Sequence, residues 1–281
     1  MSTSTRYQQV IDDLVTANRI LARFGVLDGF GHVSVRHPDN PAHFLLSRSL
    51  APELVTAQDI MEFDETSETA AADGRKPYLE RYIHGEIYRA RPDVQAIVHS
   101  HSPSVIPYAG SNVRLRPIYH MAGFLGAGAP VFDIRCCFGH TDMLVRNRDH
   151  GRELAQTLGQ SKVSLMRGHG FVAVGGDIPV AVYRAIYTEM NASLQQKAIG
   201  LNGEITYLSD EEAALADDMM AGVMNRPWEA LEEAGVRASV IPPAMAMFTA
   251  TSAIIAPRTT SMPWAAISLP ATYGNPKAPA K

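Results

Sequence analysis

The hydrophobic positions of this chain follow two spacings, one typical of helices and one typical of strands. Apolar residues recurring every three or four positions predict a helix over residues 6–24, namely Val10, Leu14, Ala17 and Leu21. Similar spacing predicts helices over residues 78–91, 152–158, 179–199 and 210–224. Short apolar or alternating runs predict strands at residues 32–36, 44–47, 60–64, 96–101 and 131–134, and two apolar runs around a Gly-His-Gly turn predict a hairpin over residues 163–174.

This order of elements predicts one α/β domain with a mostly antiparallel sheet, covering residues 1–235. Helices lie at the ends and on the faces of the sheet in this prediction. Residues 65–76 and 110–130 are expected to be irregular. From about Pro257 the chain is rich in Pro, Ala, Ser and Thr without periodicity, so residues 236–281 are predicted to be an extended or mobile tail.

Composition narrows the class of protein. Of the 281 residues, 46% are hydrophobic, so a full core is possible, and the formal net charge is −4 without a basic block. That balance argues against nucleic acid or an anionic membrane as the partner. The two cysteines, Cys136 and Cys137, are adjacent and form no disulfide framework. The first residues are polar and lack the apolar core of a signal peptide. No apolar run reaches the roughly 18 residues that a membrane span requires, so we expect a cytoplasmic protein.

The chemistry of the chain is concentrated at the end of the predicted strand 96–101. His99 and His101 are two residues apart, so on a strand their side chains lie on the same face. Two converging imidazoles favour a bound divalent metal, since imidazole is the commonest nitrogen ligand. The alternative is a pair of hydrogen-bonded histidines at a strand end.

His169 and Glu80 extend this candidate site. His169 lies between two glycines in the hairpin turn, where the missing side chains leave the imidazole prominent. Three histidines with an open position would form a catalytic metal site, whereas a histidine bonded to the turn backbone is the alternative. Glu80 lies near the start of the predicted helix 78–91, which leads directly into this strand. It could ligate the metal or act as an acid or base. The alternative is a first-turn glutamate that is favoured by the helix dipole.

Four segments resemble the class II aldolase and adducin family, in order and with matching gaps over about residues 10–225. They are Gly-His-Val-Ser at 31–34, Pro-Tyr-Leu-Glu at 77–80, the run from Ala90 to His101, and Arg-Gly-His-Gly at 167–170. The resemblance implies a three-layer α/β/α fold around a nine-stranded, mostly antiparallel sheet, in a homotetramer. It also implies a divalent metal on His99, His101 and His169, with Glu80 as the catalytic acid or base.

The chain departs from the sugar-phosphate aldolases of that family at the phosphate site. His32 replaces an asparagine, residues 47–50 replace a Thr-Pro-(Ser/Thr)-Gly loop, and Tyr78 and Leu79 replace two serines. These substitutions add bulk and an arginine where small polar groups would hold a phosphate. Three segments, at residues 44–52, 80–88 and 117–120, are instead similar to a decarboxylase branch of the family. Its known types act on hydroxy-methylpyridine-dicarboxylate and on dihydroxyphthalates.

The leading hypothesis is therefore a metal-dependent decarboxylase of a hydroxylated aromatic dicarboxylate, with 3,4-dihydroxyphthalate as the first substrate to test. The metal is expected to be Mn²⁺ or Zn²⁺, with Fe²⁺ or Co²⁺ as alternatives, at one ion per subunit. Arg48 is predicted to bind a carboxylate bidentately, since its guanidinium matches that group. The other candidate substrate contacts are Ser47, Ser49, His32, Tyr119 and His120.

Two other functions remain open. One is a class II aldolase acting on a hydroxy-carbonyl substrate without a phosphate. The other is an adducin-like structural or binding domain that kept the fold and lost the chemistry. The presence of all three histidines and Glu80 favours an enzyme.

Overall fold

The computed structural model describes residues 3–69, 74–221, 228–230 and 233. The predicted tail, residues 236–281, and the end of the helix predicted at 210–224 lie outside these residues. Every feature reported below belongs to the part of the chain from Met1 to Ser239, which forms one compact unit.

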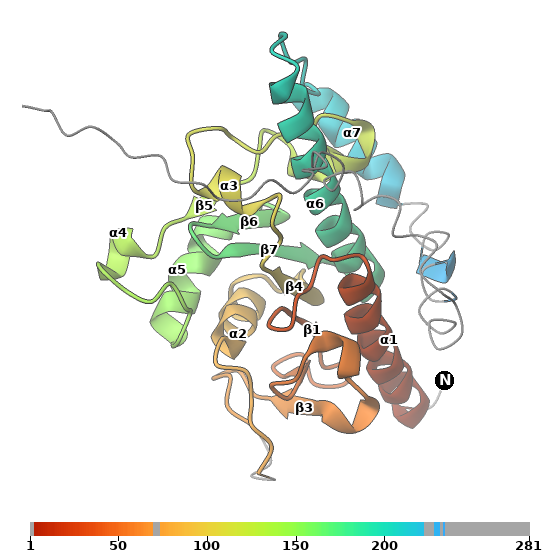
Figure 1. The fold of residues 1–281 in the computed structure, drawn as a ribbon. Coiled ribbons are helices and arrows are strands. Elements are labelled where there is room, and N and C mark those ends of the chain that lie inside the picture. The colour runs from red at the N-terminus through yellow and green to blue at the C-terminus, as the bar shows by residue number, and fades with distance from the viewer. Residues whose placement is uncertain (1–2, 70–73, 222–227, 231–232, 234–281) are drawn as a thin grey trace, which may run out of the picture. The chain divides into compact units, whose positions relative to one another are not determined.

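A single mixed sheet carries the fold, and its strands run in the spatial order β3-β2-β1-β4-β7-β6-β5. All neighbouring strands are antiparallel except β5 and β6, which are parallel. The strands are β1 (His32–Arg36), β2 (Phe44–Ser47), β3 (Ile60–Phe63), β4 (Ala96–Ser100), β5 (Val131–Phe132), β6 (Val163–Met166) and β7 (Gly170–Gly175) (Figure 1).

The expectation of nine strands is wrong for the described residues, which form seven. Two further pairings exist, between Arg48 and Pro77 and between Phe63 and Thr69, but each is a single bridge. A single bridge fixes too few backbone hydrogen bonds to extend a strand on either side. The prediction of a mostly antiparallel sheet is confirmed, with the β5–β6 pair as the exception.

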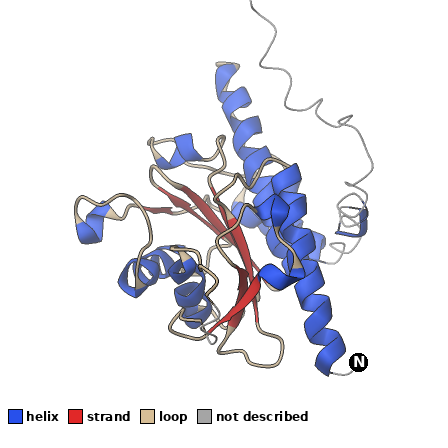
Figure 2. Ribbon diagram, turned by 60° about the horizontal axis from the view of Figure 1, so that its bottom comes forward, coloured by secondary structure: helices blue, strands red, loops and turns tan. Residues whose placement is uncertain are grey.

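Helices cover both faces of the sheet, which gives three layers (Figure 2). One face packs on α1 and α6 through a core that includes Leu14, Leu21, Val98, Ala181 and Val182. The other face packs on α2 and α5 through a second core that includes Ile83, Ile87, Ile97, Leu154 and Leu158. The helices are α1 (Thr3–Arg23), η1 (Pro52–Leu54), η2 (Ala57–Asp59), α2 (Arg81–Ala90), α3 (Ile106–Ala109), η3 (His120–Leu125), α4 (Arg135–Phe138), α5 (Arg148–Leu158), α6 (Ile178–Gly200) and α7 (Asp210–Ala221).

Strand alternation decides which side chains meet α2. Val33 and Val98 belong to the core under α1 and α6, so their strand neighbours point to the opposite face. His32 lies directly across from His99 in the β1–β4 pair. His32 and Ser34 of β1 and His99 of β4 therefore face α2, and the chemistry of the chain lies between the sheet and that helix.

Two helix starts differ from the sequence predictions. The helix predicted from residue 78 begins at Arg81, with Glu80 as its N-cap residue. The helix predicted from residue 179 begins at Ile178, because the Asp177 side chain accepts a hydrogen bond from the amide of Val180. The segment 110–130, expected to be irregular, contains η3. Among the described residues, no helix combines the length and the apolar character needed to span a bilayer.

Candidate metal centre

Three imidazoles converge at the ends of β4 and β7, as the sequence predicted. The Nε2 atom of His101 lies 3.2 Å from Nε2 of His99 and 3.1 Å from Nε2 of His169. His99 and His101 lie on the same side because they are two positions apart, with only Ser100, the last residue of β4, between them. Both glycines around His169 are required. Gly168 has φ +65°, and a Cβ on Gly170 would come within 2.0 Å of the Ser100 carbonyl oxygen.

The second ring nitrogen of each histidine faces an acceptor. Nδ1 of His99 lies 3.2 Å from the Phe171 carbonyl oxygen, and Nδ1 of His169 lies 3.0 Å from the Met143 carbonyl oxygen. Nδ1 of His101 lies 3.1 Å from the Asp28 carboxylate. An acceptor at Nδ1 places the proton of a neutral imidazole there and leaves a lone pair on Nε2. Three lone pairs therefore point at one another.

Such an arrangement is repulsive unless a cation lies between the nitrogens. Two nitrogens about 2.1 Å from one ion are expected roughly 3.0–3.4 Å apart, which the measured separations match. Burial and the neighbouring imidazoles hold the pKa of His99 well below its ordinary value, so this ring is a neutral ligand. The donor set fits a divalent metal such as zinc or manganese.

Glu80 is the fourth member of this cluster. Its Oε2 lies 3.4 Å from Nε2 of His169 and 3.7 Å from Nε2 of His99. Its Oε1 accepts a hydrogen bond of 2.8 Å from the Val145 amide. The Glu80 carboxylate makes no capping hydrogen bond to α2. It faces the histidines instead of the first amides of the helix. Burial would lower the pKa of His169, but the adjacent Glu80 carboxylate raises it above its ordinary value.

One loop positions both a metal ligand and Glu80. The carbonyl of Met143 accepts from His169, and the amide of Val145 donates to Glu80. Met143 has φ +71°, a left-handed conformation that is rare outside glycine. The conformation is stabilised by the contacts on both sides of Met143, and it aims this carbonyl at the imidazole.

A cavity of about 360 Å³ opens next to the cluster. Glu80 and His101 reach it from the metal side, and none of its lining residues is a lysine or an arginine. The lining consists of Gly29, Phe30, His32, Ser49, Leu50, Ala51, Tyr78, Leu79, Glu80, His101 and Leu144. The cavity is thus shaped by apolar and uncharged polar groups around a few ionisable ones, as small-molecule sites commonly are.

Two of the predicted substrate contacts line this cavity, and Arg48 does not. His32 and Ser49 are lining residues. Ser47 is fully buried at the end of β2 and does not reach the cavity. Arg48 points to the other side of the segment, where its Nε donates to Asp59 at 2.6 Å. This pair with Asp59 keeps the guanidinium away from the cavity.

Tyr119 and His120 are also not brought to the cavity. Tyr119 packs against Tyr187 with ring centroids 6.4 Å apart, and His120 is exposed at the start of η3. Within the described part of this chain, neither residue lines the cavity or joins the cluster.

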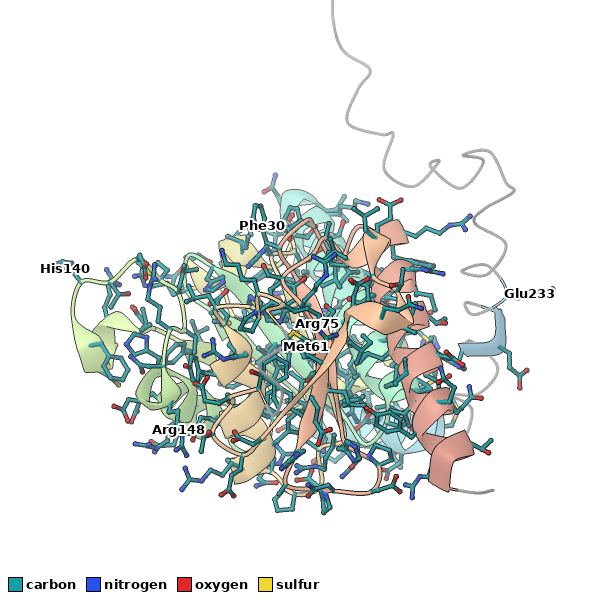
Figure 3. The ribbon with its side chains drawn as sticks, turned by 90° about the horizontal axis from the view of Figure 1, so that it is seen from below. Phe30, Met61, Arg75, His140, Arg148 and Glu233 are labelled. Atoms are coloured by element: carbon teal, nitrogen blue, oxygen red, sulfur yellow. The ribbon has the colours of Figure 1, made fainter. Side chains whose placement is uncertain are left out.

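Asp28 and Phe30 are site residues that the sequence analysis missed. Asp28 accepts hydrogen bonds of 2.9 Å from the amides of Phe30 and Gly31 while it faces His101. Although partial burial acts to raise it, these amides and His101 hold the pKa of Asp28 below its usual range, so it stays a carboxylate. Phe30 lines the cavity and is 74% exposed (Figure 3). The Asp-Gly-Phe-Gly turn before β1 was the available signal.

Asp28→Asn is expected to weaken metal binding by about 10–100-fold, because the carboxylate that orients His101 is lost while the amide oxygen keeps the turn bonds. A competition titration of purified protein against a chelator measures this. Asp39→Asn, in the exposed turn after β1, is the control and keeps the affinity of the unaltered protein. Equal affinities for all three proteins would exclude Asp28 from the metal site.

The sequence of the chain is similar to a known protein family and to several curated proteins. The Class II Aldolase and Adducin N-terminal domain matches residues 12–196. Decarboxylase tropJ of Talaromyces stipitatus is 39% identical over 239 residues, covering 76% of this chain and 90% of that protein. The 3,4-dihydroxyphthalate decarboxylase of Arthrobacter keyseri is 31% identical over 221 residues, covering 73% and 85%.

Solved structures show the same fold at lower identity. An aldolase II superfamily protein from Pseudomonas syringae has a TM-score of 0.71 at 22% identity, covering 85% of this chain and 95% of that chain. L-fuculose 1-phosphate aldolase from Glaciozyma antarctica PI12 has a TM-score of 0.69 at 24% identity, covering 85% and 93%.

Proposed function

Because the chain belongs to the decarboxylase branch of the class II aldolase and adducin family, we propose that it is a divalent-metal-dependent decarboxylase of a hydroxylated aromatic carboxylate. The carboxylate ortho to a phenolic hydroxyl leaves as CO₂. The observation that carries this proposal is the convergence of three Nε2 lone pairs and the Glu80 carboxylate beside a cavity large enough for an aromatic ring.

The chemical problem is the electron pair left when the carbon–carbon bond breaks. A divalent ion on His99, His101 and His169 would act as a Lewis acid on the phenolic oxygen. In its protonated form, Glu80 delivers a proton to the ring carbon that carries the leaving carboxylate. The carbon–carbon bond then breaks, its electrons restore the aromatic ring, CO₂ departs, and Glu80 regains a proton from water.

The lining of the cavity supports this substrate class over a sugar phosphate. Tyr78 and Leu79 occupy the positions where the related aldolases have small polar residues, and both line the cavity. No lysine or arginine among the lining residues is available for a phosphate. An aldolase acting on an unphosphorylated hydroxy-carbonyl compound is the second candidate, because the same three histidines and Glu80 would also serve it.

The finer form of the proposal is a dicarboxylate, with 3,4-dihydroxyphthalate as the first compound. It rests on the relatives that carry this name and on two hydrogen-bond donors of the cavity, Ser49 and His32. We assign the retained carboxylate to these groups instead of Arg48. The proposal also includes one Mn²⁺ or Zn²⁺ per subunit and a homotetramer, which the resemblance to the family suggests.

The experiment is CO₂ release from a small panel, with and without a chelator and added Mn²⁺. The panel holds 3,4-dihydroxyphthalate, a hydroxypyridine dicarboxylate and the matching hydroxylated monocarboxylates. CO₂ that disappears with chelator and returns with Mn²⁺ is expected from at least one hydroxylated carboxylate. Metal bound at one ion per subunit without CO₂ from any compound would overturn the proposal and favour the aldolase, to be tested by retro-aldol assays.

Ser49→Ala is expected to raise KM for a hydroxylated aromatic carboxylate about 5–10-fold, since one hydrogen bond to a charged oxygen is lost. Arg48→Ala is expected to change KM less than about twofold, because its guanidinium serves a partly exposed pair with Asp59. Steady-state kinetics of the metal-loaded proteins decide between the two. A larger effect of Arg48→Ala would restore the arginine as the carboxylate contact.

Phe30→Ala is expected to raise KM for an aromatic substrate about 3–10-fold, because an aromatic ring in the cavity loses its stacking partner. Phe24→Ala is the matched control, since Phe24 is also exposed, at 39%, and does not line the cavity. Equal KM values for both variants would remove Phe30 from the site.

A further inference from the structure

Four polar side chains form a continuous buried chain between the cavity and the interior. Nδ1 of His32 lies 2.7 Å from Nε2 of His84, and Nδ1 of His84 lies 2.6 Å from Oγ of Ser34. Oγ of Ser34 lies 2.8 Å from the hydroxyl of Tyr88. We call these residues, His32, His84, Ser34 and Tyr88, the histidine relay. They come from β1 and from one face of α2, where His84 and Tyr88 are four residues apart.

Burial keeps the histidine relay away from bulk water. The four residues are between 0% and 5% exposed. Burial lowers the pKa of His84 to about 3, so this ring is neutral and carries one proton. Nδ1 of His32 and Nε2 of His84 lie 2.7 Å apart, so one of these two nitrogens donates and the other accepts.

Two directions of donation satisfy these contacts, but they differ at the inner end. If Tyr88 donates to Ser34, then Ser34 donates to His84, His84 donates from Nε2 to His32, and every hydroxyl proton has an acceptor. In the opposite direction the Tyr88 proton has no acceptor among the described residues, since Ser34 is the only hydrogen-bond partner of its hydroxyl there. A buried donor without a partner costs free energy, so donation runs outward from Tyr88.

The outward direction of donation determines which ring nitrogen of His32 carries the proton. Its Nδ1 accepts from His84, so its single proton lies on Nε2. Nε2 makes no hydrogen bond within the described residues, and it is absent from the buried unpaired atoms, so it is open to the cavity that His32 lines. The ring is held between Tyr78 and His99, with centroids 4.5 and 4.9 Å away. It does not join the four-residue metal cluster.

We infer that His32 is a specificity-determining hydrogen-bond donor, held as the Nε2–H tautomer by the histidine relay and aimed at an anionic oxygen of the substrate. His84, Ser34 and Tyr88 are positioning residues that act through His32. The inference rests on the proposed function in that the cavity takes a hydroxylated aromatic carboxylate. A donor whose proton cannot move to the other nitrogen selects a carboxylate or phenolate oxygen over a hydroxyl that needs an acceptor.

The first test reads the tautomer directly and needs no activity. The chain contains 10 histidines, so NMR of Zn²⁺-loaded protein with ¹⁵N-labelled histidine resolves individual rings, and loss of a signal in His32→Asn assigns His32. We expect the proton on Nε2, and we expect this nitrogen to shift when salicylate, an unreactive hydroxylated aromatic carboxylate, is added but not when benzyl alcohol is added. A proton on Nδ1, or equal responses to both compounds, would overturn the inference.

The second test alters the residues that are inferred to hold the His32 tautomer. Ser34→Ala removes the group that donates to His84, so a mixed or Nδ1–H tautomer of His32 and about a 10-fold lower kcat/KM are expected at unchanged metal content. Tyr88→Phe leaves Ser34 as a terminal hydroxyl that still donates outward, so the Nε2–H tautomer is retained. Tyr82→Phe, a tyrosine of α2 outside the relay, leaves tautomer and kinetics unchanged.

A general loss of packing would affect Ser34→Ala and Tyr88→Phe alike and leave the tautomer in place. That result would also overturn the inference. If the panel of compounds yields no CO₂ while His32 keeps its proton on Nε2 and responds to salicylate, the proposed reaction fails and the donor assignment stands.

Discussion

Replacing His99 with alanine is expected to abolish metal binding and CO₂ release together. His99 is fully buried, its Nε2 is directed at the centre of the cluster, and its Nδ1 is held by the Phe171 carbonyl. Removal of an outer-shell partner typically costs about 10–100-fold, so loss of a direct ligand should cost more than about 1,000-fold in activity. Metal analysis of the purified variant and CO₂ release with added Mn²⁺ measure the two losses.

His140→Ala is the matched control. His140 is exposed on the loop that follows α4 and does not line the cavity. Figure 3 shows it well apart from Phe30. This variant should keep one metal per subunit and the activity of the unaltered protein. A His99→Ala protein that is folded by circular dichroism, binds stoichiometric metal and turns over substrate would disprove the proposed site.

Glu80→Gln is expected to lower kcat about 100–10,000-fold, which is the range for loss of a general acid or base. The amide oxygen can still accept from Val145, so the loop around Met143 should hold its position. The side chain keeps its size but can no longer transfer a proton. Metal content should fall far less than activity, because three imidazoles remain.

Glu80→Asp tests whether the carboxylate alone is enough for proton transfer or whether its position also matters. It retains a carboxylate but withdraws it by one methylene from His169 and His99, and we expect an activity between those of Glu80→Gln and the unaltered protein. Glu53→Gln, an exposed change in η1, is the surface control. Full activity of Glu80→Gln in metal-loaded protein would mean that another group moves the proton.

The convergence of the three histidines could be predicted from sequence because local geometry produces most of it. A two-residue period on a short strand places His99 and His101 together, and the Gly-His-Gly turn exposes His169. The fold class followed from the periodicity and the order of the elements. The pattern predicted the seven strands that the described residues form, and the wrong count of nine came from the family resemblance. Pairings such as Arg48 with Pro77 are single bridges here and add no strand.

The substrate contacts were predicted less well, because they depend on side-chain direction in a loop. Arg48 has the right chemistry for a carboxylate, but its guanidinium pairs with Asp59 and does not line the cavity. Asp28 was missed because its partner His101 is 73 residues away in sequence. No local pattern reveals such a pairing.

The sequence by itself determined the residue types of the centre, their common strand face and the glycines that make the turn possible. Those properties depend on backbone periodicity and on sterics within a few residues. Only the tertiary structure decided that the Met143 carbonyl and the Val145 amide orient His169 and Glu80, and that His84, Ser34 and Tyr88 orient His32. Hydrogen bonds between distant segments have no period along the chain, because the packing of α2 and the loops against the sheet brings their partners together.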